Sequence, residues 1–209
     1  PKTGASLKKE FMDNEMQLLG MGIPYQYVAD GAPSYPRGFK AVADAKGALS
    51  AQLSWTTPSV NYLGAALTGL TGTKVYRNNQ LVYTSTETTQ GKVVAWTDKP
   101  ATDGYYIYKV VPYNAVGDGV YKEFAAYVGE DLPGEPQNVT LTTHGGNAEI
   151  TWAAPANGKH GGYFDNATLK YNVVRMPDNK VVVEGTTSLR ATDAVSVQKG
   201  YSYAITAVN

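Results

Sequence analysis

Ala51-Gln52-Leu53-Ser54-Trp55-Thr56-Thr57-Pro58 decides the fold, because a similar stretch returns as Ala148-Glu149-Ile150-Thr151-Trp152-Ala153-Ala154-Pro155. The tryptophans at positions 55 and 152 are 97 residues apart. Two more pairs of segments keep nearly the same spacing: Lys74–Asn79 with Asn172–Pro177, and Tyr108–Asn114 with Tyr203–Asn209. Three similar blocks in the same order indicate an internal repeat, which determines the architecture. The sequence therefore predicts two homologous units of slightly under about 100 residues each.

Within each unit, apolar and polar residues alternate with a period of two, which places one set on a single face of a β-strand. The alternating sets are Leu49, Ala51, Leu53 and Trp55; Val139 and Leu141; Ala148, Ile150 and Trp152; and Tyr201, Tyr203, Ile205 and Ala207. Turns are predicted at Asn79-Gln80, Asp103-Gly104, Gly117–Gly119, Asp178-Asn179 and Lys199-Gly200. Short strands separated by such turns, with a tryptophan early in each unit, predict an all-β chain of two antiparallel sandwiches.

The order of these motifs resembles the fibronectin type III domain, in the form of the tandem modules found in Gram-negative bacterial surface proteins. The motifs are Trp-x-x-Pro, Tyr/Val-x-Arg, Gly-Tyr-x-Tyr and Ala-Val-Asn, and the resemblance covers residues 37–129 and 133–209. The resemblance implies a structural core that contains Trp55 and Trp152 on strand B and Tyr106 and Tyr201 on strand F, with Asn114 and Asn209 closing that strand. It specifies a fold rather than a function, because this sandwich is reused for many roles.

The resemblance also sets the expected domain organisation. Residues 1–36 are an N-terminal segment forming the tail of a preceding region, 37–129 the first fibronectin type III-like domain, 130–136 a linker and 137–209 the second domain. In the first unit Val120–Val128 is predicted as the last strand, strand G, but the second unit has no counterpart after Asn209. The favoured explanation is that the chain is a piece of a longer protein. The alternative is that another chain supplies the strand by β-augmentation.

The two segments outside the repeat carry their own expectations. Leu7, Phe11, Met12, Met16 and Leu19 have helical spacing. We expect this helix to pack on the first unit, with a swapped or partner-binding helix as the alternative. The linker contains Pro133 and Pro136, which stiffen it toward extended geometry and suit a spacer with limited bending.

Composition excludes several classes of protein. The formal net charge is 0 and cysteine is absent. Without thiols there is no disulfide framework, cysteine-based metal site or cysteine nucleophile. Without net positive charge no whole-chain field attracts nucleic acid, and no apolar run approaches the ~20 residues of a membrane span. We expect no cofactor and no metal.

Candidate catalytic groups are sparse. His144 and His160 each precede Gly-Gly in different predicted loops of the second unit, so solvent-exposed loop residues are expected. No nucleophile elbow, zinc-binding helix or phosphate loop occurs. The loose carboxylates are Glu130, Asp131, Asp165 and Asp178, each beside a turn-forming residue. The pair Glu130-Asp131 offers oxygens to Ca²⁺, but two adjacent acids are weak evidence for a site.

Aromatic residues give the candidate binding sites. Tyrosine occurs 16 times against 4 phenylalanines and 3 tryptophans. Tyr62, Tyr163 and Phe164 fall in two Gly-rich insertions, 59–72 and 156–166, between the predicted strands B and C. Loops at the ends of a sandwich commonly carry binding. Trp96 lies on predicted strand E, where the second unit has Ala191, so it fills a larger local core or marks a surface.

These observations predict a non-enzymatic spacer and adhesion module of a larger bacterial cell-surface or secreted protein. Its expected partners are neighbouring domains of the same polypeptide and a host protein or glycan. The localisation, extracellular or at the cell surface, follows from the resemblance alone. Two other classes remain open: a carbohydrate-binding or accessory region of a secreted glycosidase or protease, and a catalytic domain in its own right.

Overall fold

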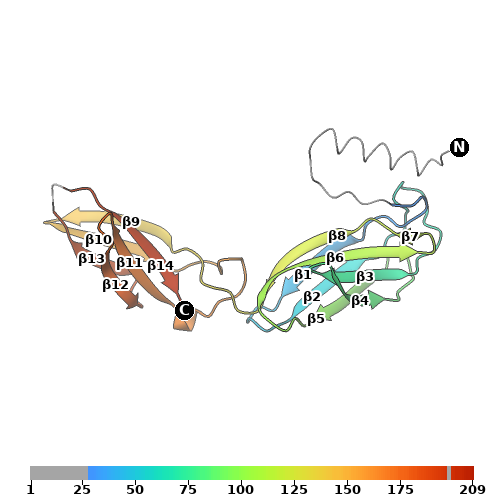
Figure 1. Cartoon of the computed structure of the whole chain (residues 1–209), viewed down its shortest axis with the longest axis horizontal. Helices are drawn as coiled ribbons and strands as arrows, with labels where there is room; N and C mark the ends of the chain where they lie inside the picture. The colour runs from blue at the N-terminus through green and yellow to red at the C-terminus, as the bar shows by residue number, and fades with distance from the viewer. Residues whose placement is uncertain (1–27, 197–198) are drawn as a thin grey trace. The chain divides into compact units, whose positions relative to one another are not determined.

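The computed structural model of the chain describes residues 28–196 and 199–209. It consists of β-strands with a short 3-10 helix, η1 (Asn166–Thr168). The chain forms two compact units, each centred on one sandwich of two sheets (Figure 1). The expected all-β fold of two tandem antiparallel β-sandwiches is therefore confirmed. The exact domain boundaries stay a prediction, and the predicted helix over residues 7–19 lies outside the described residues.

The first unit has one three-stranded sheet and one larger sheet. The smaller sheet has the order β1 (Arg37–Ala43), β2 (Ala51–Thr56), β5 (Val93–Asp98). The larger sheet has the order β4 (Gln80–Ser85), β3 (Gly72–Arg77), β6 (Gly104–Asn114), β7 (Gly117–Asp118), and β8 (Lys122–Val128) also pairs with β6. The predicted last strand is thus present in this unit.

Trp55 on β2 fills the space between the two sheets of the first unit. Its side chain is 1% exposed, and the alternating residues Ala51 and Leu53 are buried beside it. The indole Nε1 donates a hydrogen bond of 3.1 Å to Oγ1 of Thr73 on β3. This bond joins one sheet to the other through the core. Leu49, grouped with this set from its spacing, precedes β2 and is exposed.

Asparagines form the turn between β3 and β4. Asn78 and Asn79 have φ of 47° and 66°, a left-handed conformation that Asn tolerates better than most residues and that two-residue hairpin turns require. The Oδ1 atom of Asn78 also accepts a hydrogen bond of 2.9 Å from the backbone N–H of Ile107 on β6. The predicted turn therefore lies one residue earlier than Asn79-Gln80.

Residues 29–34 pack on the first unit. Ala32 is fully buried, Asn114 donates from Nδ2 to the carbonyl oxygen of Gly31 at 2.9 Å, and the N–H of Val120 donates to the carbonyl oxygen of Pro33 at 3.0 Å. Asn114 thus does more than close its strand, because it also fixes the segment that precedes β1.

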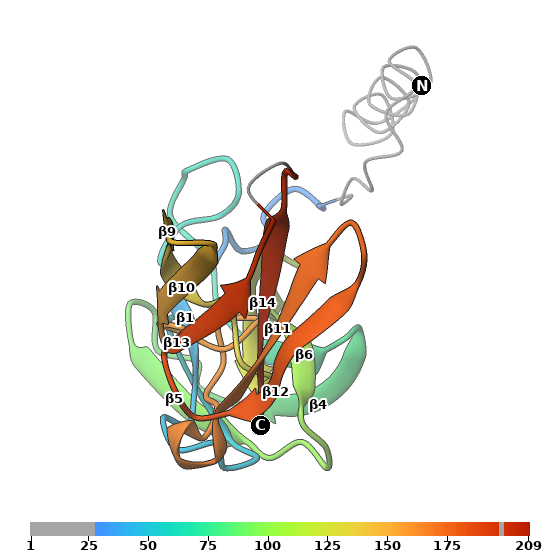
Figure 2. The ribbon, with the colours of Figure 1, turned by 90° about the vertical axis from the view of Figure 1, so that its left-hand side faces the viewer.

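The second unit repeats this plan with two three-stranded sheets. Their orders are β13 (Arg190–Ala194), β10 (Asn147–Ala153), β9 (Gln137–His144), and β12 (Lys180–Thr186), β11 (Lys170–Met176), β14 (Ser202–Val208) (Figure 2). Trp152 on β10 is buried and meets Tyr171 of β11 edge-on, with ring centroids 5.4 Å apart. In the described chain, β14 pairs with β11 alone, and no counterpart of β8 is present.

The two strand-F tyrosines that were predicted in the core are half-buried instead. Each lies under an arginine from an inner strand of its sheet: Arg77 is 5.5 Å from the ring centroid of Tyr106, and Arg175 is 4.3 Å from that of Tyr201. In the first unit the fully buried strand-F ring belongs to Tyr108. The arginine shared by the repeated segments Lys74–Asn79 and Asn172–Pro177 therefore makes a cation–π contact in both units.

The two core tryptophans differ in hydrogen bonding, and this difference is testable. Trp152 Nε1 is buried and has no acceptor among the described residues, whereas Trp55 Nε1 is bonded to Thr73. We expect Trp55→Phe to destabilise its unit by about 1–3 kcal/mol more than Trp152→Phe, because only the first change leaves a buried polar partner unsatisfied.

Urea unfolding followed by NMR signals assigned to each unit measures both effects in the whole chain. Equal losses for the two substitutions, or a larger loss for Trp152→Phe, would contradict the hydrogen-bonding difference.

Candidate functional site

The predicted binding aromatics do not form an open platform. Phe164 is 6% exposed and belongs to the core of the second unit, which corrects its assignment as a binding residue. Tyr62 is half-buried, and its hydroxyl donates to Oδ1 of Asp30 at 2.6 Å. Tyr163 is half-buried, and its carbonyl oxygen accepts a hydrogen bond from the N–H of Asp131 at 2.6 Å. These insertions therefore contribute packing at the ends of their own sandwiches.

Trp96 closes one side of the first sandwich. It lies on β5, at the edge of one sheet, and stacks on Tyr83 of β4, at the edge of the other. The ring centroids are 4.8 Å apart and the planes differ by 3°. One face of the indole is thus occupied within the protein. The equivalent Ala191 of the second unit is partly buried against its core.

The carboxylate of Asp131 organises the segment that was predicted as a proline-stiffened linker. Asp131 is 1% exposed. Its Oδ1 accepts from the N–H of Leu132 and from Nδ1 of His160, both at 2.8 Å. Its Oδ2 accepts from the N–H groups of His160 at 2.7 Å and Gly162 at 3.0 Å. The imidazole thus points Nδ1–H at the carboxylate.

Backbone pairing extends this contact along residues 130–134. The N–H of Lys159 donates to the carbonyl oxygen of Leu132 at 2.8 Å, and the N–H of Gly134 donates to that of Asn157 at 3.1 Å. A Cβ at Gly158 would lie 2.5 Å from Asp131 Oδ2. The Gly-rich composition of the 156–166 insertion is therefore needed for the approach of the loop to this carboxylate.

The electrostatics of Asp131 follow from these donors. Burial alone would raise its pKa, but hydrogen bonds from His160, Gly162 and Leu132 hold the pKa below its ordinary value. A carboxylate that already accepts four N–H donors has little capacity left for a cation, so the Glu130-Asp131 pair does not favour Ca²⁺. No cluster of three or more potential metal ligands occurs within residues 28–196 and 199–209.

The other candidate acids and the second histidine are separate from this cluster. Asp165 caps η1 by accepting from the N–H of Ala167 at 2.9 Å, and Asp178 pairs with Arg175. His144 is exposed at the end of β9. His160 is exposed as well, as predicted for both histidines, but its imidazole is also bonded to Asp131. Sequence reasoning missed this pair because its members are 29 positions apart.

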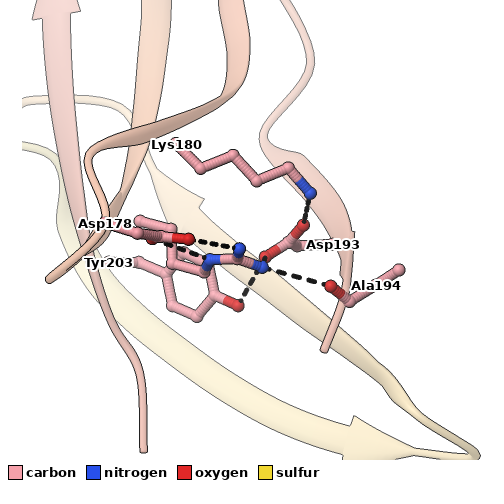
Figure 3. Close-up of polar contacts among 6 residues, drawn as sticks. Asp178, Lys180, Asp193, Ala194 and Tyr203 are labelled. Carbon is pink, nitrogen blue, oxygen red and sulfur yellow. Dashed lines mark hydrogen bonds and ion pairs between the residues drawn. The ribbon is translucent and has the colours of Figure 1, made fainter. Parts of the chain in front are cut away.

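A second polar cluster joins the two sheets of the second unit (Figure 3). Arg175 of β11 donates to Oδ2 of Asp193 on β13 at 2.7 Å and to Asp178 at 2.6 and 3.1 Å. Lys180 of β12 donates to Oδ1 of Asp193 at 2.5 Å, and the hydroxyl of Tyr203 on β14 donates to its Oδ2 at 3.0 Å. Asp193 is 3% exposed, so one buried carboxylate receives donors from all three strands of the facing sheet.

The groups of this cluster stabilise one another's protonation states. Burial disfavours the charged form of Asp193, but donors from Lys180, Tyr203 and Arg175 hold its pKa below the ordinary value. Burial, together with the hydrogen bond to Asp193, raises the pKa of Tyr203 to about 12. The pKa of Arg175 is raised chiefly by its hydrogen bonds to Asp178. All three groups therefore keep the protonation state that the contacts require.

An open groove runs along one side of the second sandwich, between β9 and β14. It has a volume of about 1230 Å³ and is lined by residues 132–137, Val139, 156–159, Tyr203 and 205–209. Every residue of β9 is exposed.

Comparison with known proteins does not identify a family for this chain. No family model and no curated protein matches the chain. The FN1–FN3 domains of chicken CNTN1 align at 15% identity and a TM-score of 0.38 over 90% of this chain and 66% of that one. The central fibronectin-III array of RIM-binding protein aligns at 16% identity and a TM-score of 0.32, over 87% of this chain and 65% of that one.

A segment of two fibronectin type III domains from chicken tenascin aligns at 14% identity and a TM-score of 0.31, over 83% of this chain and 90% of that one. The chain thus spans 66% and 65% of the first two structures. At these TM-scores the likenesses carry no argument about this chain, and its fold class is read from its own strand order.

The role of Asp131 predicts a local effect of its removal. Asp131→Ala leaves four donors without their acceptor, so we expect faster amide hydrogen exchange at His160 and Gly162 and a loss of about 2–3 kcal/mol in the stability of the second unit. The exposed neighbour gives a matched control, Glu130→Ala, which should change neither. Unchanged exchange at both amides in Asp131→Ala would show that the carboxylate does not hold this loop.

Asp193 predicts a pH dependence. Because its pKa is lower in the folded state, its stabilisation is complete above the ordinary value of 3.8 and is lost as pH falls through the folded-state pKa. We expect Asp193→Asn to destabilise the second unit by about 3 kcal/mol at pH 7, since one partner of a buried ion pair is removed. Urea unfolding at a series of pH values should show the two proteins converging well below pH 3.8.

The control substitution is Asp178→Asn, at a carboxylate whose side chain is 45% exposed, where solvent screens the ion pair and a smaller loss is expected. If Asp193→Asn is as stable as the wild type at pH 7, the cluster does not join the sheets as described.

Proposed function

We propose that the chain is a non-enzymatic spacer and adhesion module of a larger bacterial cell-surface or secreted protein, where it separates neighbouring domains. The observation that supports the proposal is that the buried charged side chains join parts of the fold to one another. Asp131 ties a connecting segment to a loop, and Arg175 with Asp193 ties one sheet to the other. Charged groups placed in this way hold a scaffold together, whereas catalysis requires them to face a reacting group.

The connection between the units supports the same role. Residues 130–134 are paired with 157–159 and 163 through backbone hydrogen bonds and bridges, so few connecting residues are left without structure of their own. A spacer benefits from a short unstructured connection, because each free residue adds conformational freedom. The bacterial and extracellular setting is taken from the resemblance of the sequence motifs.

No membrane-crossing helix is found in the part of the chain that the structure describes, as none reaches the necessary length and hydrophobicity.

Stretching the chain between its ends tests the spacer proposal. Each sandwich has its own tryptophan-centred core, so we expect two separate unfolding events in optical tweezers, one for each unit. Asp193→Asn should weaken one event and leave the other unchanged, because the cluster lies in the second unit. A single gradual extension without discrete events would contradict a spacer role for the module.

A further inference from the structure

The outer edge of β5, in the first unit, is unprotected against pairing with another strand. Among the strands that the structure describes, β5 pairs with β2 alone. The strands before and after it in the chain, β4 and β6, both belong to the facing sheet and do not cover this edge. Sheet edges are usually protected by charged side chains, proline or β-bulges. Residues 93–97 of β5 contain no charge and no proline, and Val93 is 67% exposed.

The equivalent strand of the second unit, β13, is protected. It also lies at the end of its sheet, beside β10, so in neither unit does the described chain place a further strand at this position. β13 carries Arg190, whose side chain is 71% exposed, and the buried, inward-pointing Asp193. An exposed charge and an inward-pointing charge both oppose the pairing of an edge. The first unit has neither within residues 93–97.

The pairing of β5 with β2 determines which of its backbone groups are free. The N–H of Thr57, directly after β2, donates to the carbonyl oxygen of Lys92 at 2.9 Å. In an antiparallel pair, the N–H and C=O groups of one residue point to the same side, and those of the next residue point to the other side. The even-numbered residues of β5 therefore bond toward β2. The residues whose N–H and C=O groups point outward are Val93, Ala95 and Thr97.

This edge is complementary to itself in antiparallel pairing. When Ala95 lies opposite Ala95 of a second copy, Val93 lies opposite Thr97, and the outward N–H and C=O groups of all three residues meet partners. The central side chain is small and exposed, so it does not obstruct the approach of the two backbones. Between these pairs, Trp96 lies opposite Val94 of the second copy, and pairs of an aromatic with a β-branched residue stabilise sheets.

The charges beside the edge and the position of Trp96 favour a second copy as the occupant. The same register places Lys92 opposite Asp98, so no like charges face each other. Asp98 is buried, and the register therefore avoids repulsion rather than adding an exposed ion pair. Trp96 is half-buried, with one face of its indole on Tyr83. Pairing with a second copy would cover more of an indole that its own unit leaves partly in solvent.

We propose that two copies of the chain associate through β5, which joins their three-stranded sheets into one antiparallel sheet around a two-fold axis at Ala95. A contact of this isologous kind closes after two copies. It uses far fewer than the roughly 20–30 residues a side of a stable complex, so the dimer is weak, with a dissociation constant above about 10 µM. The inference goes beyond the proposed function, because a spacer requires no contact with another copy of itself.

Sedimentation velocity of the 209-residue chain measures the association directly. Over about 10 µM to 1 mM, the average mass should rise from that of a monomer toward that of a dimer. Amide hydrogen exchange at Val93, Ala95 and Thr97 should slow as the concentration rises, and exchange at Val94 and Trp96, which already bond to β2, should change less. A monomer throughout this range would overturn the inference. So would slow exchange at the three outward amides that does not depend on concentration, because another segment would then occupy the edge.

Variants at the axis test the register. Ala95→Lys places two like charges opposite each other and should raise the dissociation constant at least about tenfold. Ala95→Glu should do the same, whereas an equimolar mixture of these two variants should associate about as tightly as the wild type, because Lys then faces Glu. The matched control is Val42→Lys, at an exposed position of β1 on the opposite edge of the same sheet, which should leave the dissociation constant within about twofold. Dispersed NMR spectra establish that each variant is folded.

Two results from these variants would also overturn the inference: equal association of Ala95→Lys and Val42→Lys, or no recovery of association in the mixture. Neither result alters the two unfolding events expected when single molecules are stretched. Failure of the pairing through β5 and failure of the spacer role are therefore distinguishable.

Discussion

The burial of one indole between two small sheets is the constraint on which each unit depends. Trp55 and Trp152 occupy equivalent strands, and the apolar residues that alternate with them form the inner face of that sheet. A sandwich of this size has room for one modest core, so a single large side chain decides how far apart the sheets lie. The first unit adds a hydrogen bond from the indole to Thr73, whereas the second packs its indole against Tyr171.

Polar contacts then fix the relative placement of sheets and loops, which the apolar core alone does not determine. In both units an arginine of an inner strand covers a tyrosine of strand F, and in the second unit that arginine also reaches Asp193 in the facing sheet. Hydrophobic burial is non-directional, whereas a carboxylate with several donors is satisfied in one arrangement only. Asp193 and Asp131 therefore specify relative placement: Asp193 joins two sheets and Asp131 joins a loop to the segment before β9.

The sequence was sufficient for the fold because alternation, turns and the repeat are all local or periodic signals. Trp55 and Trp152 are buried, as expected for core residues. The candidate site was less predictable. Phe164 was predicted as a binding aromatic of a loop but is buried, and His160 is exposed as predicted but has an unforeseen bond to Asp131. Such contacts depend on how each loop folds back onto the rest of the chain, and the type and spacing of residues do not specify the path of a loop.

Fluorine NMR of the chain labelled with 5-fluorotryptophan tests the central claim most directly. The solvent isotope shift between H₂O and D₂O reports whether each ring contacts water. Two of the three resonances, assigned to Trp55 and Trp152 by substitution, should show almost no shift, and the Trp96 resonance should show an intermediate one. A shift at either Trp55 or Trp152 as large as that of a fully hydrated indole would contradict the sandwich built around a buried tryptophan.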